Sequence, residues 1–228
     1  MIGIIGAMEI EVADLRKLLD NPQVKTISGI DFYSGRLCDK DVVVARSGVG
    51  KVFAAVCAQT MICEFGVTSI INSGIAGTLT AELHIGDVAI STGFVQRDMD
   101  TSAVGDPIGM ISGINMIDLP ADADMAETLK TVCAKMELNC RSGKITSGDQ
   151  FVCSHERRAW IAETFGGIAC EMEAASIAQV CYINKIPCVS IRVISDEASG
   201  EVFDDYATFS RRAADISTSL TEALLWHL

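Results

Sequence analysis

Residues 190–196 read Ser-Ile-Arg-Val-Ile-Ser-Asp, an apolar, β-branched run that contains one arginine and ends in a Ser-Asp pair. Such a run is typical of a buried strand in a parallel sheet. Buried strands rarely carry a charge without a partner, so Arg192 and Asp196 both need an interaction. Because ligands of open α/β sheets bind beyond the carboxyl ends of the strands, Asp196 is a candidate binding or catalytic residue.

Short β-branched runs and helical patterns alternate along the rest of the chain. We expect strands at residues 2–7, 29–37, 41–47, 69–73, 87–95, 141–147, 168–172 and 187–195, and helices at 9–19, 52–65, 121–136, 155–165, 174–183 and 205–225. Residues 97–120 are expected to form a long loop, and long loops in compact domains are usually functional. The alternation predicts one α/β domain over residues 1–228, with three α/β/α layers around a central mixed, twisted sheet.

The composition excludes several kinds of partner. The chain is 49% hydrophobic and acidic, with 18 Lys and Arg against 30 Asp and Glu, which argues against nucleic acid. No apolar run reaches the roughly 18 residues that a membrane span needs. The nine cysteines include no Cys-x-x-Cys pair and the three histidines show no ligand spacing, so we expect no metal site. An odd cysteine count without a secretory leader indicates a cytoplasmic protein.

Two glycine-rich segments follow predicted strands. Residues 47–51, Ser-Gly-Val-Gly-Lys, resemble a phosphate loop, but a Walker A loop would need Gly at position 45 and Ser or Thr at 52, where this chain has Ala45 and Val52. These glycines allow a ligand to approach the backbone closely, or they form an ordinary strand–helix turn. Residues 73–77, Ser-Gly-Ile-Ala-Gly, are expected to form a second turn with the same two interpretations.

Carboxylates lie at two further strand ends. Glu9 and Glu11 directly follow the first strand, either as first-turn helix acids or as a carboxylate at the edge of the sheet. Glu171 and Glu173 lie where a strand becomes a helix, and Glu173 is able to accept hydrogen bonds from two hydroxyls. Phe151 follows a strand and a glycine, so it stacks on a planar ring or fills the core.

Six motifs occur together and in order: Gly-Ile-Ile-Gly-Ala-Met-Glu at residues 3–9, Ser-Gly-Val-Gly-Lys at 47–51, Asn-Ser-Gly-Ile-Ala-Gly at 72–77, Ser-Gly-Asp-Gln-Phe at 147–151, Glu-Met-Glu-Ala-Ala at 171–175 and Arg-Val-Ile-Ser-Asp at 192–196. With these motifs the chain resembles the bacterial 5′-methylthioadenosine/S-adenosylhomocysteine nucleosidases, from residue 1 to the last helix. The resemblance implies a purine nucleoside phosphorylase-like fold. It also implies hydrolysis of the N-glycosidic bond of these nucleosides, without a cofactor, by a cytoplasmic homodimer that serves methionine salvage.

The resemblance also implies roles for individual residues. Glu11 would activate the attacking water, and Asp196 would protonate N7 of adenine so that the base leaves neutral. Glu173 would bond the ribose hydroxyls and favour the oxocarbenium-like sugar. The substrate-binding set is completed by residues that wall the pocket, stack on or bond the base, or lie near the water site: Ala7, Met8, Val49, Phe151, Val152, Glu171, Met172, Arg192 and Ser195.

The chain departs from this family at two places. Ile75 stands where family members usually carry Ser or Thr, and Asp106 lies in the loop expected near the 5′ substituent. The preferred 5′ substituent therefore stays open. Two other functions are compatible with the sequence: a phosphate-dependent nucleoside phosphorylase, and a nucleoside-binding protein with weak or no turnover. Glu11 argues against the first, because its charge would repel phosphate.

Overall fold

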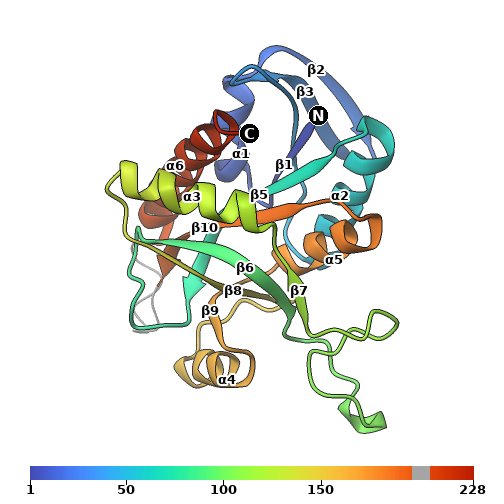
Figure 1. Ribbon diagram of the computed structural model, residues 1–228, viewed down its shortest axis with the longest axis vertical. Coiled ribbons are helices and arrows are strands. Elements are labelled where there is room, and N and C mark those ends of the chain that lie inside the picture. The colour runs from blue at the N-terminus through green and yellow to red at the C-terminus, as the bar shows by residue number, and fades with distance from the viewer. Residues whose placement is uncertain (197–205) are drawn as a thin grey trace.

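The computed structural model describes residues 1–196 and 206–228 (Figure 1). Its strands are β1 (Ile2–Gly6), β2 (Asp20–Ile27), β3 (Ile30–Leu37), β4 (Lys40–Arg46), β5 (Ser69–Thr78), β6 (Val88–Gln96), β7 (Asp118–Pro120), β8 (Cys140–Ser147), β9 (Gly167–Glu171) and β10 (Cys188–Asp196). They form one mixed sheet in the order β10-β6-β8-β9-β5-β1-β4-β3-β2, with β7 paired to β6. Because β10 also pairs with β5, five of these strands close into a ring, from which β1 to β4 extend.

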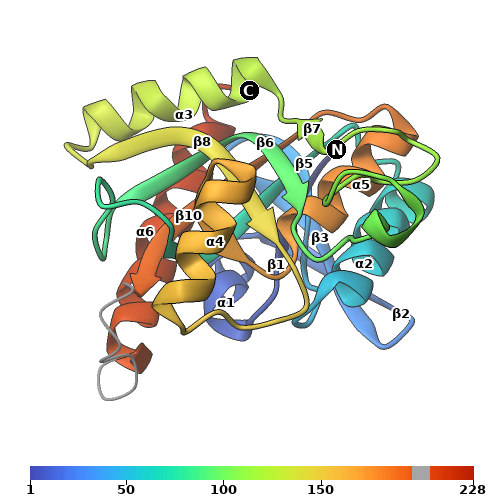
Figure 2. The same ribbon diagram turned by 90° about the horizontal axis from the view of Figure 1, so that it is seen from below.

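Helices cover both faces of the sheet. Figure 1 shows α1 (Glu9–Lys17), α3 (Ala123–Lys135) and α6 (Tyr206–Leu225) on one side, and α2 (Lys51–Phe65) and α5 (Ala174–Asn184) on the other. Figure 1 shows α4 (His155–Phe165) below β8 and β9, and in Figure 2, seen from below, α4 lies in front of the strands; it packs against β9. No helix in the described part of the chain is long and apolar enough to cross a membrane. The predicted three-layer mixed α/β fold is confirmed.

The two faces of the sheet bury separate apolar cores. On one face Leu15 of α1 and Leu220 of α6 are fully buried against Ile4 and Ile71 of the sheet. On the other, Met61 of α2 packs with a cluster that includes Ile70. Each such side chain contributes about 1.5–3 kcal/mol by leaving water. The cores therefore hold the strand ends in fixed positions.

Three predictions about local structure need correction. Residues 73–77 are not a turn but the second half of β5, where glycines let β10 side chains approach. Residues 20–27 form the unpredicted edge strand β2, since their polar, exposed side chains gave no buried-strand signal. The predicted loop 97–120 contains a short 3-10 helix at Ser102–Val104 and ends in β7. The last predicted helix, 205–225, is observed from Tyr206 to Leu225, and its predicted first residue, Asp205, lies outside the described residues.

Candidate active site

A cavity of about 390 Å³ opens where β1, β5 and β10 end. Those three strands are parallel, so their carboxyl ends meet at one edge of the sheet. The lining residues are Ala7, Met8, Glu11, Val49, Ile75, Ala76, Gly77, Arg97, Gln150, Phe151, Val152, Cys170, Glu171, Met172, Glu173, Ser195 and Asp196. Every residue of the predicted site lines this cavity except Arg192. Their individual roles stay predictions.

Glu11 is the carboxylate of the first helix that points inward. Its Oε2 accepts the N–H groups of Ala7 at 2.7 Å and Met8 at 2.8 Å, and its Oε1 accepts that of Ile75 at 3.0 Å. Burial raises the pKa of the Glu11 carboxyl, although Arg192 and these backbone donors oppose the rise. The neighbouring Glu9 lies at the surface, where it pairs with arginine side chains. The structure thus separates two acids that their spacing alone left equivalent.

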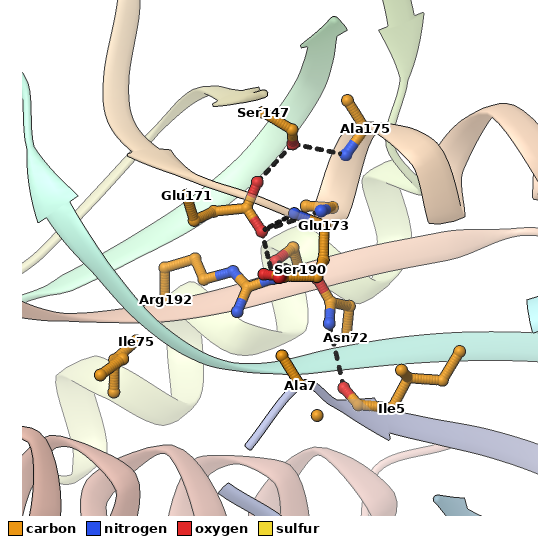
Figure 3. Close-up of polar contacts among 12 residues, drawn as sticks. Ile5, Ala7, Asn72, Ile75, Ser147, Glu171, Glu173, Ala175, Ser190 and Arg192 are labelled. Atoms are coloured by element: carbon orange, nitrogen blue, oxygen red, sulfur yellow. Dashed lines mark hydrogen bonds and ion pairs between the residues drawn. The ribbon is translucent and has the colours of Figure 1, made fainter. Parts of the chain in front are cut away.

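Arg192 lies beside the cavity floor and is fully buried. Its Nη2 donates to Oε2 of Glu171 at 2.7 Å and also to Oδ1 of Asn72 (Figure 3). In Figure 3 Glu171 lies between Arg192 and Ser147, whose hydroxyl donates to the other carboxylate oxygen. Gly74 is essential for this packing, because a Cβ there would collide with both Arg192 and Glu11. Arg192 therefore compensates buried carboxylates and does not line the cavity.

Glu173 lies at the start of α5, with one carboxylate oxygen bonded to the backbone of another element. Its Oε1 accepts the N–H of Gly50 at 2.8 Å. Gly50 has φ of +103°, a conformation that side chains rarely adopt, so the residue before α2 must be a glycine. Burial, together with the nearby charge of Glu171, raises the pKa of Glu173 to about 8.

Asp196 ends β10 and is also buried. Its Oδ2 forms an ion pair with Nη2 of Arg158, and its Oδ1 accepts the hydroxyl of Ser195 at 3.0 Å. Arg158 comes from α4, and its Nε also donates to the carbonyl of Val152 at 3.1 Å. A Cβ at Gly77 would lie 2.9 Å from Oδ2, so glycine gives this carboxyl group its room. Arg158 thus joins Asp196 to the loop that carries Phe151.

The loop 148–152 forms the adjoining wall. Nη2 of Arg97 donates to the carbonyl of Gln150 at 2.5 Å and to that of Gly148 at 3.3 Å. Phe151 is half-exposed beside the cavity and Val152 is buried. Arg97 is itself buried, and this burial lowers the pKa of its guanidinium group. Its Nε and Nη1 have no hydrogen-bond partner in the described structure. Such an arrangement favours a fixed position for the loop.

Sequence reasoning missed two arginines of this site. Arg158 shares one helix face with the buried Ile161 and Phe165, a spacing of three and seven residues that indicates an inward position. Arg97 follows the apolar strand β6 without any comparable signal.

The two residues at which the chain differs from the family lie in different places. The Ile75 side chain lines the cavity, whereas Asp106 does not line it and accepts a hydrogen bond from the Thr101 hydroxyl at 2.8 Å. Among the described residues no group of three or more acidic, cysteine or histidine side chains is placed to hold a metal ion.

The chain is similar to known proteins along nearly its whole length. The phosphorylase superfamily matches residues 1–225. A 5′-methylthioadenosine/S-adenosylhomocysteine nucleosidase of Shewanella denitrificans is 40% identical, over 100% of this chain and 99% of that protein. The nucleosidase of Staphylococcus haemolyticus is 38% identical, over 99% of each chain.

Solved structures agree in fold. A mutant of the Helicobacter pylori nucleosidase with 5′-methylthioadenosine in its active site has a TM-score of 0.95 and 32% identity, covering 100% of this chain and 98% of that one. A futalosine hydrolase of the same organism has a TM-score of 0.94 and 34% identity, covering 100% and 97%.

Proposed function

This chain belongs to the 5′-methylthioadenosine/S-adenosylhomocysteine nucleosidase family of the phosphorylase superfamily, and we propose that it hydrolyses the N-glycosidic bond of these two nucleosides. The products are adenine and the 5-substituted ribose. The observation that carries this proposal is a single cavity lined by Glu11, Glu173 and Asp196, three buried carboxyl groups with different partners. Binding alone needs no such set, whereas glycoside hydrolysis uses an acid and a base.

Glu11 acts on the water. Its raised pKa makes it a stronger base near neutral pH than an exposed glutamate. Three backbone N–H groups fix the direction of its carboxylate, so that a water beside it has a defined position. As the sugar becomes oxocarbenium-like, Glu11 takes a proton from this water, and the water oxygen bonds to C1′ of the ribose.

Asp196 acts on the leaving group. Adenine is a poor leaving group as an anion, so the Asp196 carboxyl group delivers a proton to N7 as the C1′–N9 bond breaks, and the base departs neutral. Arg158 and the Ser195 hydroxyl each hold one oxygen of the Asp196 carboxyl group, which fixes it at the purine end of the cavity. Phe151 and Val152 supply the neighbouring wall for the ring.

Glu173 holds the ribose. A carboxylate accepts hydrogen bonds from the 2′ and 3′ hydroxyls, and its negative charge favours the positive charge that develops on the ring. The Gly50 N–H fixes one of its oxygens. Met172 and Met8 line the cavity beside it and contribute apolar surface for the sugar and its 5′ substituent.

The charges of the cavity support water over phosphate as the nucleophile. Of the four carboxyl groups that line it, those of Glu171 and Asp196 are paired with Arg192 and Arg158, whereas those of Glu11 and Glu173 have no such ion pair. Nη2 of Arg97 already donates to two loop carbonyls. The ionised Glu11 carboxylate would repel a phosphate dianion at the position of the water.

We further propose that residues 1–228 act as one domain and that two copies form a cytoplasmic homodimer that serves methionine salvage. Support for the dimer comes from apolar side chains on the outer faces of two helices that pack together: Val52, Phe53 and Val56 on α2, and Tyr182 and Ile183 on α5, all exposed. Exposed apolar side chains on neighbouring helices favour association with a partner. A monomer in small-angle scattering, at a concentration at which the chain releases adenine, would contradict the dimer.

Release of adenine, followed by ultraviolet absorbance, tests the activity. We expect turnover of both 5′-methylthioadenosine and S-adenosylhomocysteine. A protein that binds these nucleosides in calorimetry but releases no adenine would instead be a nucleoside-binding protein.

A further inference from the structure

The first turn of α2 is capped by a residue almost one hundred positions away in the sequence. Its N-cap residue is Gly50, which has no side chain to accept the free N–H groups of the first turn. Instead Oδ1 of Asp149 accepts the Lys51 N–H at 2.8 Å. Asp149 belongs to the loop 148–152, so the start of α2 and the loop beside the purine end are directly bonded.

Asp98 binds both Lys51 and Asp149 from a third part of the chain. It lies just beyond β6, where its Oδ2 accepts the Asp149 N–H at 2.9 Å and its Oδ1 accepts Nζ of Lys51. Partial burial opposes ionisation, but the bonds from Lys51 and Asp149 hold the pKa of Asp98 below its usual value. Lys51, Asp98 and Asp149 thus form one hydrogen-bonded group, the clasp.

The clasp lies between two walls of the cavity. On one side Gly50, next to Lys51, donates its N–H to Glu173. On the other side Asp149 precedes Phe151 by two residues, and the loop is held by Arg97, the neighbour of Asp98. A small shift of the clasp therefore displaces both the donor to the ribose carboxylate and the wall of the purine end.

We propose that Asp98 is a positioning residue for the nucleosidase reaction: by binding Lys51 and Asp149 together, it sets the spacing between the ribose wall and the purine wall. The inference rests on the proposed function, because it assigns these walls to the two parts of a nucleoside. Asp98 itself does not line the cavity. Its effect is therefore on substrate affinity more than on the bond-breaking step.

Loss of the clasp also changes the pKa of Glu173. The Gly50 N–H favours the ionised carboxylate, so displacing it raises the pKa of Glu173 further. The other groups that face Glu173 are Glu171 from β9, Arg192 from β10 and Glu11 from α1, and none of them belongs to the clasp. The pH at which ribose binding improves should therefore move upward in a clasp variant.

The test uses the full chain with Asp98→Asn and Lys51→Met, and with Lys51→Arg as the conservative variant that keeps the ion pair. Asp118→Asn and Lys25→Met are matched controls, since they break surface ion pairs with Lys144 and Glu64 away from the cavity. KM and kcat for 5′-methylthioadenosine are measured across pH, and adenine affinity is measured by calorimetry.

We expect KM to rise and adenine affinity to fall about tenfold in Asp98→Asn and Lys51→Met, the effect of one lost charge-assisted hydrogen bond, with kcat changed by less than about threefold. In these two variants the increase of 1/KM with pH should occur at higher pH than in the wild type. Lys51→Arg should keep most of the affinity that Lys51→Met loses. A merely structural role would lower the folded fraction, and with it the apparent kcat, without changing KM.

The proposal is overturned if KM and its pH dependence in both variants match those of the controls. A wild-type chain that binds adenine but does not turn over the nucleoside would overturn the proposed function instead, and adenine affinities would still test the clasp.

Discussion

Replacing Glu11 by glutamine tests the assignment of the water-activating base. Oε2 of Glu11 accepts two N–H groups and Oε1 accepts one, so the amide oxygen of Gln takes the first position. The amide NH₂ then faces the Ile75 N–H, and one hydrogen bond is lost, at about 1–3 kcal/mol of stability. Removing a buried charge offsets part of this loss, so the variant should fold.

The effect on the reaction should be larger. A glutamine cannot take a proton from water, and loss of a general base lowers kcat by about 10²–10⁴, or about 3–5 kcal/mol of activation free energy. The assay is adenine release at saturating 5′-methylthioadenosine, with adenine affinity measured by calorimetry to show an intact cavity. We expect that affinity to change little.

Glu9→Gln is the matched control, because Glu9 lies in the same helical turn but pairs with Arg16 and Arg46 at the surface. It should keep wild-type kcat. The reasoning is refuted if Glu11→Gln retains more than about a tenth of wild-type kcat, or if Glu9→Gln loses as much.

Three further predictions concern the purine end and the ribose wall. Phe151→Ala should weaken adenine binding by about 1–3 kcal/mol in calorimetry, the usual contribution of an aromatic ring stacked on a base, and an unchanged affinity would remove the stacking role. Arg158→Met leaves the Asp196 carboxylate buried without its partner, so the free energy of unfolding in urea should fall by about 3–5 kcal/mol; a change under about 1 kcal/mol would show that the ion pair is not structural. Glu173 has a pKa of about 8 in the folded protein against an ordinary value of 4.5, so the folded state keeps this proton to higher pH than the unfolded state does. Its contribution to stability is therefore complete below about pH 4.5 and is lost as the pH rises to about 8. Glu173→Gln should flatten that part of the melting temperature–pH curve, and an equal slope in both proteins would contradict the raised pKa.

The sequence predicted the layers and most elements because apolar runs and helical periods follow directly from burial. It failed where local composition and tertiary position disagree. The stretch 73–77 looked like a turn, but its glycines lie in β5 because Arg192 and Asp196 of β10 need the space that a Cβ would fill. The edge strand β2 is polar and contains Pro22, so nothing in its pattern resembles a buried strand.

The sequence predicted the carboxylates of the site but not its arginines Arg97 and Arg158. Glu11, Glu173 and Asp196 stand at strand ends or in recognisable motifs, so local sequence patterns suffice to find them. Arg158 meets Asp196 across 38 positions of sequence, and Asp149 caps α2 across 98. Contacts of this kind depend on how α4 and the loop 148–152 pack, so one sequence alone does not reveal them.

The nucleophile is the central claim, and the products formed with and without phosphate test it most directly. The wild-type chain is incubated with 5′-methylthioadenosine in phosphate-free buffer and in buffer with added phosphate, and the sugar product is identified by mass spectrometry. Because Glu11 lies where phosphate would be repelled, we predict equal rates of adenine release and free 5-methylthioribose in both buffers. Adenine release that requires phosphate and yields a sugar 1-phosphate would contradict hydrolysis and identify a phosphorylase.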